Sequence, residues 1–165
     1  MSTGFTYAIY IESTPERVWR ALTERADTRR FWRHRTAGGK TLVTDWEKGS
    51  TWALVHEDAG VAVHDPEQVV LESDPPHRLS YTWHSFTPEW AEAVGLAPEI
   101  AAAWRAEPRS KVAFDIEDAG HGVVKLTVVH DGFGPASAVL GSISLGWPSV
   151  LSSLKTLLET GSPLP

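Results

Sequence analysis

One long helical stripe near the C-terminal end constrains the fold more than any other feature. Across residues 137–160, apolar side chains recur every three or four positions: Val139, Ile143, Trp147, Val150/Leu151, Leu154 and Leu157/Leu158. This spacing predicts a helix of about six turns, roughly 33 Å long, with one apolar face. Gly161 and Pro163 mark its end, and Pro148 inside the stripe predicts a kink near Leu145-Gly146.

Much of the remaining chain has the two-residue period of β-strands. The predicted strands are residues 5–12, 41–46, 51–56, 68–72, 79–86, 111–117 and 123–130. Gly120-His121-Gly122 predicts a hairpin between the last two, and Asp74-Pro75-Pro76 ends the fourth. Turns of the hairpin type join the strands, so we expect an antiparallel sheet.

Short helices are predicted in two places between these strands. Thr14 can cap a helix that starts at Pro15, and a second helix is expected at about residues 27–33, followed by a turn at Gly38-Gly39. The stretch between residues 86 and 111 has helical propensity at 88–94 and 98–106. It is too long for a hairpin loop, so we interpret it as an insertion that covers part of the molecule.

The element order predicts an α+β domain spanning residues 1–161, with a frayed tail at 162–165. A single helix about 10 Å across cannot cover six or seven strands spaced about 4.8 Å apart. We therefore expect the sheet to curl around the helix and to leave an interior cavity.

Composition narrows the class of protein. The 165 residues include no cysteine, which excludes disulfides, a thiol nucleophile and thiolate metal sites. The net charge of −6 disfavours nucleic-acid binding. The sequence has no apolar run of 18 residues, so no membrane span is expected. It has no secretory signal at its start, so we expect a cytoplasmic location.

The eight tryptophans are unusual for this length and suggest an aromatic pocket. Strand and helix periodicity places one set of residues on the inward faces, and we predict these as ligand-binding residues: Trp52, Tyr81, Trp83, Phe114, His130, Ile143, Trp147 and Leu151. The alternative is that these side chains only fill the core. In the pocket hypothesis, Pro148 lets the helix bend as a gate and the Trp90/Trp104 insertion acts as a lid.

Histidines and charged clusters give weaker signals. His130 shares the inward parity of its strand and could orient a ligand or act as an acid or base, or it could be a hydrogen-bonded structural residue. His84 has the opposite parity to Trp83, so we expect it to face outward. The sequence has no metal-ligand spacing, so no metal and no cofactor are expected. It also has no catalytic signature.

Two charged groups have a functional and a simpler interpretation. The arginines around Trp32 could form a phosphate, RNA or partner patch, or the solvated face of a short helix: Arg25, Arg29, Arg30, Arg33 and Arg35. The carboxylates at strand ends and turns could pair for glycoside-type chemistry, or could simply be solvated: Glu57, Asp58, Asp115, Glu117 and Asp118. The net charge favours the simpler interpretation for the arginines.

Four segments resemble the SRPBCC (START-like) superfamily, and within it the bacterial branch named after the activator of heat-shock-protein-90 ATPase. They are Ile11–Trp19, Asp74–Trp83, Leu126–Phe133 and Gly146–Lys155. The resemblance implies a helix-grip fold, with a deep pocket between the sheet and the C-terminal helix. Relatives use this pocket for lipids, sterols, polyketides or plant hormones, and some of them are cyclases or hydrolases.

These observations together predict a protein that binds a small hydrophobic molecule of a lipid, polyketide or aromatic type. One alternative is a cyclase or aromatase that uses the same pocket. Another, implied by the name of the branch, is a co-chaperone that binds a chaperone partner. A homodimer is compatible with each of these.

Overall fold

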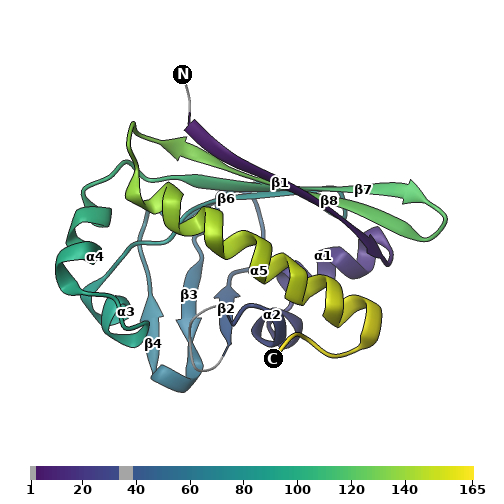
Figure 1. The fold of residues 1–165 in the computed structure, drawn as a ribbon, viewed down its shortest axis with the longest axis horizontal. Coiled ribbons are helices and arrows are strands. Elements are labelled where there is room, and N and C mark those ends of the chain that lie inside the picture. Colours follow the sequence, from purple (N-terminus) through teal and green to yellow (C-terminus); the bar gives the residue numbers. More distant parts are fainter. Residues whose placement is uncertain (1–2, 34–38) are drawn as a thin grey trace.

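The computed structural model describes residues 3–33 and 39–165 and has the predicted α+β architecture. Figure 1 shows a long C-terminal helix lying between one extended sheet and a second, smaller sheet. The elements are β1 (Thr3–Glu12), α1 (Pro15–Thr23), α2 (Arg25–Phe31), β2 (Lys40–Val43), β3 (Ala53–His56), the 3₁₀ turn η1 (Glu57–Ala59), β4 (Val61–Val63), β5 (Val70–Asp74), β6 (Arg78–Thr82), α3 (Pro88–Ala93), α4 (Pro98–Arg105), β7 (Lys111–Gly120), β8 (Val123–Phe133) and α5 (Ala138–Thr160).

All paired strands are antiparallel, as predicted, but they form two sheets where the sequence analysis expects one. The larger sheet has the order β1-β8-β7-β6-β5 and the smaller one the order β2-β3-β4. A single bridge between Thr51 and Val69 connects them. The three-residue strand β4 was not predicted, because three residues are too few to show a period.

Helix α5 confirms the predicted stripe. The Ser137 hydroxyl caps it by accepting from Leu140 N at 3.0 Å, and Gly161 ends it with φ 86°, in the left-handed region that favours glycine. The helix is one continuous element in Figure 1, and Pro148 lies inside its range. Its buried side chains include most of the predicted stripe: Val139, Trp147, Val150, Leu151, Leu154 and Leu157. These side chains form the centre of the core against the larger sheet.

The helices after β1 begin as the capping residues predict. Thr14 Oγ1 accepts from Arg17 N at 3.2 Å, and Pro15 opens α1. Helix α2 starts at Arg25 and ends at Phe31, two residues earlier at each end than expected. The turn predicted at Gly38-Gly39 falls partly outside the described residues, since Gly38 is not among them.

Strands β7 and β8 form the longest hairpin, and its tip is the predicted Gly120-His121-Gly122 turn. All three residues have positive φ, between 55° and 82°, which the two glycines adopt without strain. Figure 1 shows this tip projecting beyond the rest of the molecule. Within the described residues, no helix is both long and apolar enough to cross a membrane.

Candidate functional site

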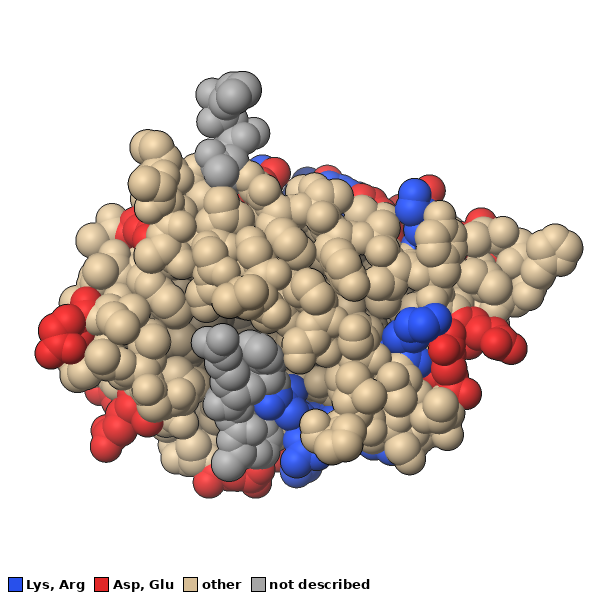
Figure 2. Space-filling view, in the orientation of Figure 1, with Lys and Arg blue, Asp and Glu red and all other residues tan. Residues whose placement is uncertain are grey.

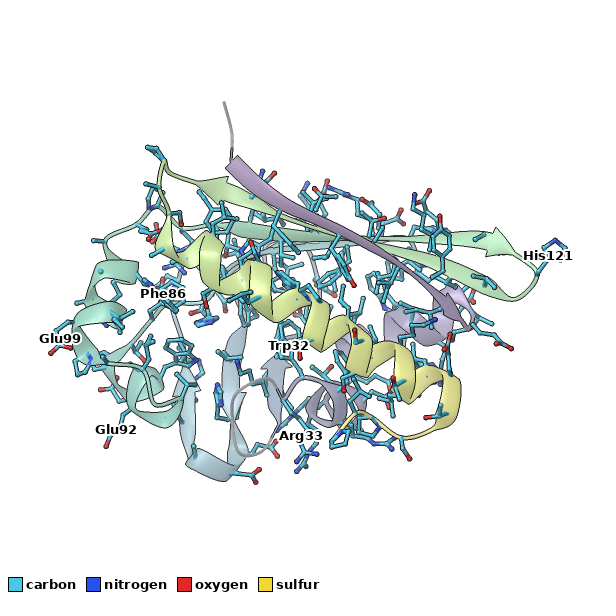
Figure 3. All side chains as sticks on the ribbon, in the orientation of Figure 1. Trp32, Arg33, Phe86, Glu92, Glu99 and His121 are labelled. Atoms are coloured by element: carbon cyan, nitrogen blue, oxygen red, sulfur yellow. The ribbon has the colours of Figure 1, made fainter. Side chains whose placement is uncertain are left out.

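A cavity of about 100 Å³ lies under the N-terminal half of α5. Figure 3 shows Trp32 beneath this helix and Phe86 beside it, toward α3 and α4. The lining residues come from segments far apart in the sequence: Trp32, Lys40, Trp83, His84, Phe86, Trp90, Trp104, Val139, Ser142, Ile143, Gly146, Trp147 and Val150. The cavity predicted from the width of the helix is therefore present, and it is small.

Aromatic rings form most of the wall. The Trp32 and Trp147 rings have centroids 5.4 Å apart, and those of Trp83 and Trp147 are 5.7 Å apart. On the side of α3 and α4, Phe86 packs 5.3 Å from Trp104 and 5.5 Å from Trp90. Such spacings are typical of tilted aromatic pairs. The 88–106 insertion thus provides one wall of the cavity, in agreement with the expectation that it covers part of the molecule.

Three of the eight predicted ligand-binding residues line this cavity: Trp83, Ile143 and Trp147. Four others are packed in the core instead, namely Trp52, Tyr81, Phe114 and Leu151. The Tyr81 ring lies 5.2 Å from that of Trp52 and 6.2 Å from that of Phe114, so these rings fill space against one another. Burial raises the pKa of Tyr81 and keeps its hydroxyl protonated.

His130 points inward, as predicted, but it is not a lining residue of the cavity. Trp147 Nε1 donates to its Nδ1 at 3.0 Å, so Nδ1 carries no proton. The proton is therefore on Nε2, which donates to Ser110 Oγ at 2.9 Å. With both nitrogens engaged, and with a pKa that burial lowers to about 3, His130 has the features of a neutral structural histidine.

His84 corrects the sequence prediction, because its side chain is buried and faces the cavity. Strand β6 ends at Thr82, so the alternation used to assign His84 to the outer face no longer applies to it. Its Nδ1 donates to the Ser85 carbonyl at 2.8 Å, and its ring packs 4.9 Å from that of Trp90. Burial lowers the pKa of His84 to about 3, so it is neutral near pH 7.

Residues 83–86 form an irregular segment that polar side chains hold in place from the side away from α5. Arg109 donates to the Trp83 carbonyl at 2.7 Å and to Ser85 Oγ at 3.0 Å, while Arg105 donates to the Phe86 carbonyl. The Ser85 backbone N–H donates to Gln68 Oε1 at 2.9 Å. These bonds satisfy the Trp83 and Phe86 carbonyls and the Ser85 N–H, which lie beyond the end of β6, and they fix the cavity-facing rings.

Asp65 completes this network. It accepts from Ser85 Oγ at 2.6 Å and pairs with Arg109 at 3.1 Å. The bond from Ser85 is the main cause that lowers the pKa of Asp65, and the Glu67 backbone N–H and Arg109 add to it. A second, more polar hollow of about 220 Å³ lies here, and it shares five lining residues with the first: Trp83, His84, Phe86, Trp104 and Val139.

Lys40 is a charged lining residue that the sequence analysis did not predict. It begins β2 and pairs in register with His56 of β3. Among the described residues, no carboxylate lies within 4 Å of its Nζ. Burial lowers the pKa of Lys40 to about 8. A lysine that opens a short strand is normally exposed, so no sequence signal marks it.

The charged clusters follow their simpler interpretation where the structure describes them. Arg25 and Arg29 both pair with Glu57, and Arg30 donates to the Gly161 carbonyl at 2.8 Å. Arg35 lies outside the described residues. Asp115 pairs with Arg78 at 2.7 Å.

Figure 2 shows a largely uncharged surface across the middle of the molecule, where α5 lies, with acidic side chains at the α3–α4 end. No three His, Asp or Glu side chains of the described chain gather into a metal site.

Known proteins resemble this chain both in sequence and in fold. A sequence model of the family described as activator of Hsp90 ATPase homolog 1-like protein matches residues 12–159. Among curated proteins, no sequence matches the chain significantly.

Solved structures with low sequence identity share the fold. A Mesorhizobium loti protein has a TM-score of 0.67 at 22% identity, with 94% of this chain and 96% of that chain covered. The Aha1 dimer of Colwellia psychrerythraea has a TM-score of 0.65 at 19% identity, with 96% and 98% covered. An Hsp90 activator of Plasmodium falciparum has a TM-score of 0.64 at 17% identity, with 94% and 95% covered.

Proposed function

Since this chain belongs to the activator of Hsp90 ATPase homolog 1-like family, whose members share this sheet-and-helix fold, we propose that it binds a small hydrophobic molecule in the cavity under α5. The ligand class is that of lipid-, polyketide- or aromatic-type molecules. The observation that supports this most is the cavity wall, in which Trp32, Trp83 and Trp147 meet below α5 while Trp90 and Trp104 face them from α3 and α4.

The size of the cavity limits how such a ligand enters. Its volume is about 100 Å³, whereas an engineered apolar cavity that binds benzene measures about 150 Å³. A ring can therefore enter only if part of it stays in the opening or if a wall side chain moves. Trp104 is only partly buried and belongs to the insertion predicted to act as a lid. We propose that this side chain moves when the ligand enters.

Binding can be tested by adding a panel of apolar compounds while recording tryptophan emission and melting temperature. A compound present at about one hundred times its Kd should stabilise the protein by about 2.7 kcal/mol. If no compound changes either signal at roughly millimolar concentration, where binding energy is only about 4 kcal/mol, the proposed function is wrong.

A matched pair of α5 variants shows whether the cavity is the binding place. Ser142 lines the cavity, so Ser142→Phe should fill it and remove binding. Gly141 precedes it, and a Cβ there would meet nothing within 4 Å, so Gly141→Phe adds the same ring outside the cavity. Equal loss of binding in both variants would place the ligand elsewhere.

The enzyme alternative loses its main candidate in this geometry. A cyclase or aromatase needs an acid or base that faces the substrate. His130 was the expected group, and it is hydrogen-bonded at both nitrogens and does not line the cavity. We therefore propose binding without catalysis. Turnover of a polyketide-like substrate that stops in His84→Phe would contradict this proposal.

A chaperone-binding role is the second candidate, because two similar structures are named as Aha1 and as an Hsp90 activator. Two of the five arginines expected to serve it, Arg25 and Arg29, already pair with Glu57. Stimulation of chaperone ATPase turnover by the purified protein would favour this role.

The Colwellia structure is a dimer, so a homodimer is also proposed, and analytical ultracentrifugation tests it.

A further inference from the structure

We propose that the ligand is a flat, mostly apolar monoanion, such as a small aromatic carboxylate, whose charged group pairs with Lys40. This inference depends on the proposed function, because it names the class of molecule that the same cavity takes. It is carried by the charges and hydrogen-bonding groups of the cavity wall.

Lys40 is the single formal charge among the described residues that line the cavity. The other lining residues are aromatic or aliphatic, apart from Ser142 and His84. No carboxylate of the described chain lies within 4 Å of Lys40 Nζ to balance it. A partly buried cation without a counter-ion is costly, and an anionic ligand would supply that counter-ion.

The titratable groups near Lys40 are two neutral histidines, which supply no counter-charge. His56 faces it across the β2–β3 pair, and burial together with the Lys40 charge lowers the pKa of His56 to about 4. His84 lines the same cavity and is also neutral near pH 7. The Lys40 charge is thus opposed by no other charge on the wall, and its attraction for an anion is stronger there than in bulk water.

Hydrogen-bonding capacity points the same way. Trp90 lines the cavity, is 6% exposed, and its Nε1–H has no acceptor among the described residues. Lys40 adds an ammonium group, which only donates. Two donors on the wall, Trp90 Nε1–H and the Lys40 ammonium, therefore have no acceptor among the described residues, and an ionised carboxylate only accepts. The flat shape follows from the aromatic wall: Trp32, Trp83 and Trp147 pack against one another and line the cavity, and a planar group can lie against such rings.

The inference can be tested with benzoate and benzamide, two planar molecules of nearly the same shape that differ in charge. Binding is measured by calorimetry and by shifts of the tryptophan indole N–H signals in NMR spectra. We expect the protein to bind benzoate at least tenfold more tightly than benzamide. Lys40→Met should remove this preference and leave benzamide affinity within about twofold. Lys48→Met, which removes the same charge from an exposed loop position, should keep the preference.

The possible results separate the two proposals. If benzamide and other neutral apolar compounds bind and benzoate binds no more tightly, the charge inference is wrong and the apolar pocket stands. The same holds if Lys40→Met retains the preference for benzoate. If neither benzoate, benzamide nor any neutral apolar compound binds, both proposals are wrong.

Discussion

The indole nitrogen of Trp147 donates a hydrogen bond to Nδ1 of His130, and the two nitrogens lie 3.0 Å apart in the buried core. This bond joins α5 to β8. It also selects one tautomer of His130, because the other would place two N–H groups face to face. A polar contact thus specifies how the helix is rotated about its axis over the sheet.

Replacing Trp147 by Phe should lower the free energy of unfolding by about 2–4 kcal/mol. The change leaves His130 Nδ1 buried without a donor, which costs about 1–3 kcal/mol, and it removes part of a ring from the core. Urea unfolding followed by circular dichroism measures this. Trp19→Phe is the control, because Trp19 is partly buried and its indole nitrogen bonds to no described residue. Equal losses in the two variants would show that the hydrogen bond adds nothing.

Acid should destabilise the protein through its buried histidines. The pKa of His84 is about 3 in the folded protein and 6.5 when unperturbed, so between these values the unfolded chain binds a proton that the folded one does not. Its contribution is complete above pH 6.5 and is lost as pH falls toward 3, at up to about 1.4 kcal/mol per pH unit. His84→Phe should reduce that slope in urea titrations at pH 4–6. His64→Phe, at an exposed position, is the matched control, and an unchanged slope in His84→Phe would contradict the prediction.

Replacing Lys40 by Met should stabilise the protein at pH 7, by up to about 3 kcal/mol, because it removes a desolvated charge. The folded pKa of Lys40 is about 8 against 10.5 when unperturbed, so the folded protein binds fewer protons than the unfolded chain between these values. The wild-type protein therefore gains stability as pH rises from 8 to 10.5, and the advantage of the variant shrinks. Urea unfolding at pH 7, 9 and 10 measures this gap, and a gap that widens would contradict the burial of the charge.

Arg109→Met should loosen the cavity wall from behind. Arg109 holds the Trp83 carbonyl, Ser85 Oγ and Asp65, and the loss of these bonds should cost about 2–4 kcal/mol of unfolding free energy. Ligand affinity should fall as well, since Trp83 and His84 lose their fixed positions. The exposed Arg20→Met should change neither quantity. A normal affinity in Arg109→Met would show that the segment keeps its shape without the arginine.

Periodicity predicted the parts of the fold that are long and regular. The β7–β8 hairpin and α5 follow from alternation and from the three-to-four spacing, since each spans ten residues or more. Strand β4 and the division into two sheets were missed. A three-residue strand shows no period, and the separation of the sheets depends on one bridge between Thr51 and Val69 rather than on any local pattern.

The site was harder to predict than the fold. Strand and helix periodicity identifies which side chains point inward, and it did so for Trp83, Trp147 and Phe114. It does not distinguish a side chain that faces empty space from one that faces another ring, which is why Phe114 was predicted beside the cavity and is packed in the core. Lys40 and His84 were missed because tertiary contacts, and not the alternation of a strand, place them against the cavity.

Residues Trp83, His84 and Phe86 form a wall between two hollows. The hollow under α5 is mostly apolar, and the other one contains the charged side chains of Arg105 and Arg109. Such a wall cannot shift on one side alone. A ligand that displaces His84 must strain the hydrogen bonds of Arg109 to the Trp83 carbonyl and Ser85 Oγ. An ion that draws Arg109 away must loosen the Trp83 and His84 rings. Because the two hollows share these residues, a change in the wall of one hollow also changes the wall of the other.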